Sequence, residues 1–177
     1  KLIKELINAD EEPGLSLAQP IYDFALPFLN IENPIDENAL ALEIFALLSQ
    51  ISTDFVEDQV HDCLEVSKKI LNSSESRYFP SAALFLSVIC VSFREIVEET
   101  INELLPRLLE IIDTRINPVG KIKIEPKQLS QVALSTCEIV KEYDRRDISS
   151  DLSKNAIDMI NSKDGFKKIN LCGAQML

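Results

Sequence analysis

The chain has 177 residues, of which 46% are hydrophobic and 27% are charged, and its net charge is -11. This composition is ordinary for a folded domain with a substantial core, so disorder over most of the chain is excluded. There are only four glycines and no glycine-rich loop of the kind that phosphate-binding and dinucleotide folds need. The negative charge lies in residues 1–120, whereas residues 121–177 are slightly basic. A negative potential repels nucleic acid and attracts cationic partners.

Apolar residues recur at intervals of three and four nearly throughout, which predicts an all-α fold. A turn at 10–14 precedes the predicted helices, which cover residues 15–30, 37–51, 53–71, 78–93, 95–113, 127–143 and 150–161. We expect Pro27 to kink the first of them and Asp36 to cap the second. The long loop 114–126 interrupts the third pair, and a less periodic tail covers 162–177.

The uncharged stretch 78–93 is shorter than the roughly 20 residues that cross a bilayer, so a buried helix with Phe79, Phe85 and Phe93 in the core is expected, and no membrane contact. The cysteines are far apart and lack C-x-x-C spacing, which is typical of buried thiols in a reducing compartment, cytoplasm or nucleus. They are Cys63, Cys90, Cys137 and Cys172. Because the chain begins at Lys1, we expect a fragment of a larger protein.

One short signature occurs three times, as Ala41-Leu42, Ala83-Leu84 and Ala133-Leu134. The pairs are 42 and 50 residues apart, which brackets the period of about 40–47 residues found in stacked helix-pair repeats. The prediction is therefore a single domain over residues 1–177, built as an α-solenoid of about three antiparallel helix hairpins with flanking helices.

Two first helices carry Ala25-Leu26-Pro27-Phe28-Leu29 and Leu104-Leu105-Pro106-Arg107-Leu108, each followed by a turn and an Ala-Leu second helix. This pattern, over residues 15–161, resembles HEAT repeats, and it would also admit armadillo repeats. The resemblance implies a non-catalytic scaffold that binds proteins and holds no cofactor. The acidic balance is similar to that of importin-β-type nuclear transport receptors. Glu37 and Asn38 depart from the family's usual aspartate and arginine pattern.

Acidic residues on two first helices are the expected contacts for a basic peptide or partner subunit. They are Glu57, Asp58, Asp62, Glu65, Glu98, Glu99 and Glu103. Three lysines, Lys121, Lys123 and Lys127, form a second candidate, because a cationic loop on an acidic body suits an acidic peptide or a phosphate, although a solvated loop without a role is the more common case. An exposed apolar groove, if present, would suit an amphipathic helix or an extended peptide.

The single histidine, His61, lies four residues from both Glu57 and Glu65, but a metal site needs further ligands and a solvated helix face is the simpler interpretation. His61 and Cys63 point away from each other on a helix, so they do not form a nucleophile pair. Three alternatives stay open: a transport-receptor segment, a chromatin- or RNA-associated scaffold using the basic C-terminal third, and a helical enzyme or regulatory domain using loop 114–126.

Overall fold

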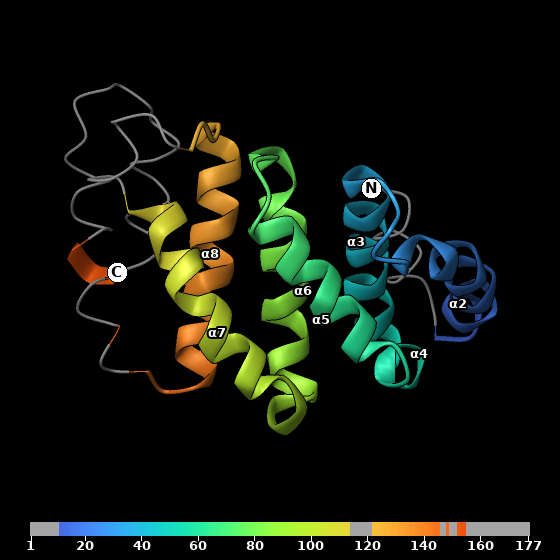
Figure 1. Cartoon of the computed structure of the whole chain (residues 1–177). Helices are drawn as coiled ribbons and strands as arrows, with labels where there is room; N and C mark the ends of the chain where they lie inside the picture. Colours follow the sequence, from blue (N-terminus) through green and yellow to red (C-terminus); the bar gives the residue numbers. More distant parts are fainter. Residues whose placement is uncertain (1–10, 114–121, 146–147, 149–151, 155–177) are drawn as a thin grey trace.

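The computed structural model describes residues 11–113, 122–145, 148 and 152–154, and every regular element in these ranges is helical (Figure 1). The elements are α2 (Glu11–Ala25), η1 (Leu26–Leu29), α3 (Ile35–Ile51), α4 (Asp54–Glu57), α5 (Val60–Leu71), η2 (Ser76–Tyr78), α6 (Phe79–Ser92), α7 (Arg94–Ile112) and α8 (Pro126–Glu142). The all-α prediction is confirmed for this part of the chain. Within the same ranges, no helix combines the length and the apolar character needed to span a bilayer.

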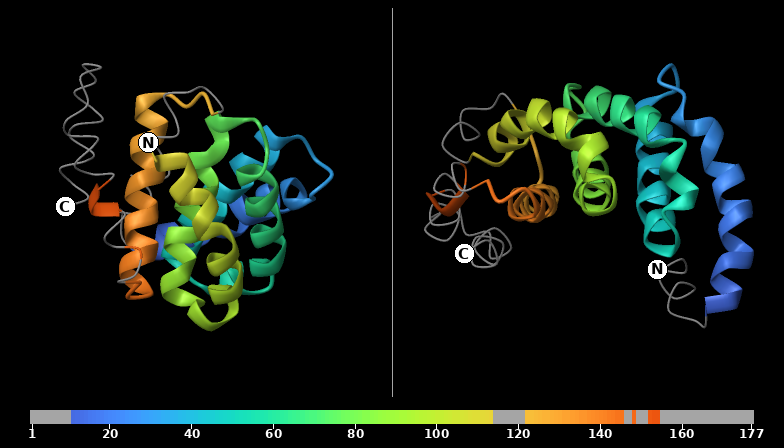
Figure 2. Two further views of the ribbon diagram at one scale, coloured as in Figure 1. Left: turned by 60° about the vertical axis from the view of Figure 1, so that its left-hand side comes forward. Right: turned by 90° about the horizontal axis from the view of Figure 1, so that it is seen from below.

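The helices form two layers. Helices α3, α6 and α8 lie side by side and run in the same direction, with α6 packed between the other two (Figure 1). The right-hand view of Figure 2 shows an arch with these three helices on its inner side, α5 and α7 on its outer side, and α2 at one end. The chain passes repeatedly from an outer to an inner helix: α2 to α3, α5 to α6, and α7 to α8.

The observed bounds correct four local predictions. The expected turn at 10–14 is wrong from Glu11 on, because α2 begins there and tolerates Pro13 in its first turn, where N–H groups have no acceptor inside the helix. Pro27 does not kink one long helix; the chain tightens into the separate helix η1. Asp36 is not the cap, since α3 begins at Ile35 after Pro34. The helix predicted over 53–71 is broken into α4 and α5.

The small residues of the repeated signature are in the core: Ala41, Ala83 and Ala133 are fully buried. Side chains of this size let the three inner helices approach closely. The leucines that follow behave differently, because Leu42 is buried whereas Leu84 is 39% exposed. The apolar sequence of α6 predicted a helix covered on all sides, but the helix exposes Leu84 to the inner face of the arch. Of its predicted core aromatics, two are buried and one is partly buried: Phe79, Phe85 and Phe93.

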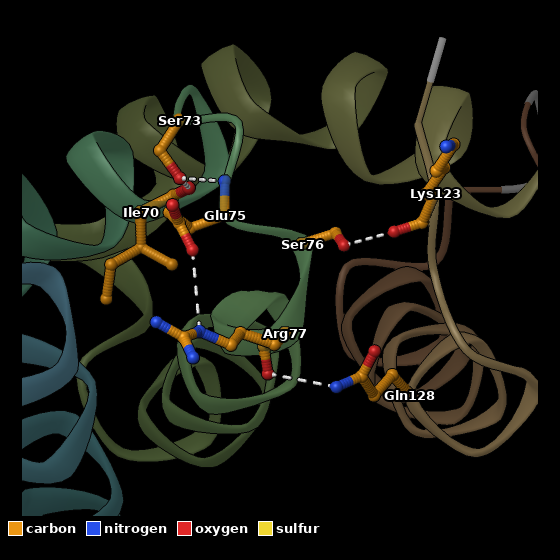
Figure 3. A network of polar contacts seen from close by, with 7 residues as sticks. All are labelled: Ile70, Ser73, Glu75, Ser76, Arg77, Lys123 and Gln128. Carbon is orange, nitrogen blue, oxygen red and sulfur yellow. Dashed lines mark hydrogen bonds and ion pairs between the residues drawn. The ribbon is translucent and has the colours of Figure 1, made fainter. Parts of the chain in front are cut away.

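Polar contacts tie the turn between α5 and α6 to the segment before α8 and to the first turn of α8 (Figure 3). The Ser76 hydroxyl donates to the Lys123 carbonyl, and the Gln128 amide donates to the Arg77 carbonyl at 3.4 Å. Gln128 also completes a capping box with Glu125 at the start of α8. Local capping and a long-range contact thus fix the position of α8 against α6.

Candidate functional site: partner-binding surfaces

A buried polar cluster shapes the turn between η1 and α3. Asn38 is fully buried, and its amide donates to the carbonyls of Phe28 at 2.8 Å and Asn30 at 2.9 Å. Lys69, from the last turn of α5, donates to the Asn38 side-chain oxygen at 2.8 Å. The same ammonium donates at 2.6 Å to each of two turn carbonyls, those of Ile31 and Asn33. The Lys69 ammonium, which belongs to one helix pair, therefore stabilises the turn within the preceding helix pair.

Arg107 makes a comparable contact one helix pair further along. Its Nε donates to the carbonyl of Leu71 at the end of α5 at 3.0 Å, and its guanidinium lies 5.9 Å from the ring centroid of Phe79. Lys69 and Arg107 are 38 residues apart. In both cases a cation on an outer helix satisfies carbonyls where the preceding outer helix turns into its inner partner.

Acidic side chains dominate the exposed surface of α4, α5 and α7. We call this set the acidic face; it comprises Asp54, Glu57, Asp58, Asp62, Glu65, Glu95, Glu98, Glu99, Glu103 and Glu110, all exposed. All seven acidic residues predicted to bind a partner belong to it. Five of these have no ion pair within the described residues: Glu57, Asp58, Asp62, Glu98 and Glu99.

The cations of the same helices are occupied by internal contacts. Lys68 lies 3.0 Å from Glu65 and 3.1 Å from Glu103, and these hydrogen bonds raise the Lys68 pKa. Lys69 and Arg107 donate hydrogen bonds to backbone carbonyls. Arg94 lies 5.2 Å from the Tyr143 ring centroid and 3.9 Å from Glu142. The acidic face therefore keeps an excess of negative charge.

The predicted acidic residues of α5 and α7 belong to one continuous surface. The two helices run in parallel (Figure 1), and Lys68 bridges Glu65 on its own helix to Glu103 on α7. Glu99 lies one turn before Glu103, so these two carboxylates share one side of α7. A partner lying across α5 and α7 would therefore meet these carboxylates together.

The lysine loop lies apart from the acidic face. Lys123 and Lys127 are exposed, before and in the first turn of α8, and Lys127 lines an open groove on the inner side of the arch. Lys121 lies outside the described residues, as do most of loop 114–126, the tail 162–177 and Cys172. Of the predicted helix 150–161, residues 152–154 are described and helical, and the others lie outside the described residues.

The inner groove has a volume of about 630 Å³ and crosses α3, α6 and α8. Its apolar lining comes from Pro80 and from one leucine of each helix, Leu47, Leu84 and Leu134. Charged side chains of both signs surround them: Glu43, Arg77, Glu125, Lys127 and Glu138. The Ser81 hydroxyl in this groove donates to Glu43 at 2.6 Å. The groove offers an apolar row with a mixed-charge rim.

A second open hollow, the η1 pocket, adjoins the acidic face. It has a volume of about 700 Å³ and is lined by Leu26, Pro27, Leu29, Asn30, Ile31, Asp62 and Glu65. Sequence reasoning did not find this pocket, because the exposure of Leu26 and Ile31 depends on how η1 sits against α5. It also missed the role of Asn38, although a polar residue in line with the buried Leu42 and Phe45 is a signal for a buried hydrogen-bond cluster.

The cysteines and the histidine considered above as reactive groups lie in the core or at the surface. Burial raises the pKa of the Cys63 thiol and raises that of Cys90 to about 11. His61 is exposed. Within the described residues, no group of three or more His, Cys, Asp or Glu side chains is arranged to hold a metal ion.

Comparison of the chain with protein-family models, curated proteins and solved structures gives no match.

Proposed function

We propose that this chain is a non-catalytic protein-interaction module, a segment of a HEAT-like α-solenoid that binds a basic peptide or subunit on its acidic face. The observation that carries the proposal is the imbalance of charge on the outer helices. Their cations are occupied by turn carbonyls and helix-to-helix bridges, while five predicted acidic residues have no ion pair within the described residues. The field that remains attracts a cationic partner and raises its association rate.

Two features support the solenoid part of the proposal. The inner helices run parallel, and each follows an outer helix (Figure 2). Lys69 and Arg107 contact the preceding turn at a spacing of 38 residues, near the period of about 40 residues expected for such repeats. A structural unit of this kind gains its stability from its neighbours and leaves its outer surface for partners.

The test is the affinity for a fluorescent lysine- and arginine-rich peptide, measured by anisotropy over a salt series. The double variant Glu98→Lys/Glu99→Lys is expected to weaken binding by about tenfold at low salt, since each reversed contact changes from attraction to repulsion. The control Glu43→Lys/Glu138→Lys makes the same change in net charge on the inner groove and is expected to have a much smaller effect. Equal losses in both variants would mean that net charge alone, not the acidic face, governs binding.

The inner groove is a second candidate surface, favoured by its row of three leucines. It would take an amphipathic helix or extended peptide through apolar contacts. Binding that is lost in the inner-groove variant, and kept in the Glu98→Lys/Glu99→Lys variant, would favour this surface instead.

A further inference from the structure

The η1 pocket places exposed apolar side chains directly beside the acidic face. Leu26 is 38% exposed and Ile31 is 44% exposed, and both line the pocket together with Asp62 and Glu65. Phe24 nearby is 57% exposed, with its ring centroid 5.2 Å from that of Phe28. Apolar surface gathered at the edge of a charged face is typical of a place where a partner anchors a side chain.

Hydrogen bonds fix the backbone that forms the wall of the pocket. The Asn33 amide donates to the Pro27 carbonyl at 2.8 Å, and Lys69 donates to the Ile31 carbonyl at 2.6 Å. These contacts fix the backbone on both sides of Leu29, which is buried beneath. Because the wall is already ordered in the free chain, less conformational entropy is lost when a partner binds.

The charge at the rim selects the partner. Asp62 has no ion pair within the described residues, and the nearest lysines of α5 are engaged, Lys68 by carboxylates and Lys69 by carbonyls. A lysine or arginine of the partner, next to the apolar side chain that enters the pocket, would therefore pair with the Asp62 carboxylate. A second copy of this chain is a poor occupant, since its net charge is also -11.

We propose that the η1 pocket receives one large apolar side chain of the basic partner, while an adjacent lysine or arginine of that partner binds Asp62. This inference rests on the proposed function, and it adds the place and the chemistry of the anchor. The partner segment has a mixed character: a basic run that lies on the acidic face, followed by a leucine, isoleucine or phenylalanine.

Loss of the apolar anchor is expected to weaken binding by about 10- to 100-fold, the effect of leaving one large aliphatic side chain in water. The probe is a peptide array in which a six-lysine run is followed, at one to four residues, by Leu, Phe or Ser. On the unmodified chain, one spacing with Leu or Phe should bind more tightly than its Ser counterpart by that factor.

Protein variants locate the effect. The variants Leu26→Ser and Ile31→Ser should remove the difference between the Leu and Ser peptides, and Val91→Ser, an exposed apolar residue at the end of α6, should preserve it. Asp62→Asn should weaken the Leu peptide by several-fold. Circular dichroism checks that each variant is folded. If Ile31→Ser does not fold, Ile31→Ala takes its place in the comparison.

The outcomes separate the two proposals. Equal binding of Leu and Ser peptides at every spacing, with binding still lost in Glu98→Lys/Glu99→Lys, would overturn the anchor and keep the acidic face. No binding of any lysine peptide would overturn both. An uncharged Leu peptide that binds as tightly as the lysine peptide, or self-association of the chain that Ile31→Ser abolishes, would overturn the anchor's link to a basic partner.

Discussion

Replacing Asn38 by alanine should destabilise the chain far more than a typical surface substitution, because Asn38 joins three elements at once. Its amide satisfies the carbonyls of Phe28 and Asn30, and its oxygen accepts from Lys69. The site is fully buried, so water does not readily replace the lost partners.

The magnitude follows from these three bonds. Each of the two neutral bonds contributes about 0.5–1.5 kcal/mol, and the bond from the Lys69 ammonium about 1.5–3 kcal/mol. Asn38→Ala is therefore expected to lower the free energy of unfolding by about 3–5 kcal/mol. Lys69→Met should cost about 2–3 kcal/mol, less than its three bonds suggest, since the Ile31 carbonyl lies at an exposed position and water compensates it.

Urea unfolding followed by circular dichroism measures these values, and a double-mutant cycle of Asn38→Ala with Lys69→Met isolates the shared bond, with an expected coupling of about 1.5–3 kcal/mol. Lys68→Met is the matched control: this neighbouring lysine makes only surface ion pairs, so its loss should cost no more than about 1 kcal/mol. Additive effects in the cycle, or equal losses for Lys68→Met and Lys69→Met, would refute the reasoning.

Three further predictions test the core and its titrating groups. Ala133→Leu should cost about 1–3 kcal/mol in urea unfolding, because it overpacks the contact of α8 with α6, whereas the half-exposed Leu84→Ala should cost about 1 kcal/mol or less; the reverse order would contradict the packing. Since burial raises the Cys90 pKa to about 11, iodoacetamide at pH 8 should label Cys90 much more slowly in the folded chain than in urea, and equal rates would argue against its burial. Burial also raises the Tyr143 pKa to about 12, and its hydroxyl donates to the Arg94 carbonyl at 3.2 Å, so its stabilising contribution is complete below about pH 10 and lost as pH rises towards 12; Tyr143→Phe should reduce that loss, and an unchanged pH profile would contradict it.

Local periodicity accounts for what the sequence could predict. The helix bounds are correct within a few residues for α3, α6, α7 and α8, because apolar spacing and turn residues act over short distances. The burial of Ala41, Ala83 and Ala133 and the exposure of the predicted acidic residues within α5 and α7 follow from the same pattern. The broken segment 53–71 and the separate helix η1 were missed, since tertiary packing overrides local preference there.

The long-range polar contacts were beyond sequence reasoning for a different reason. Lys69 and Arg107 bond to backbone carbonyls, which every residue carries and no side-chain pattern marks. Whether a lysine of α5 is free to contact a partner therefore depends on the fold. The η1 pocket depends on it in the same way, because the packing of η1 against α5 decides that Leu26 and Ile31 stay exposed.

Binding of a cationic partner to the acidic face is tested by zero-length carbodiimide crosslinking of a lysine-rich peptide to the chain, with the joined carboxylates identified by mass spectrometry. This chemistry links only amines and carboxylates in contact, so it reports which acidic side chains the partner meets. We expect crosslinks at Asp62, Glu98 and Glu99 on the outer helices. Crosslinks confined to Glu43, Glu125 and Glu138 of the inner groove would contradict this expectation.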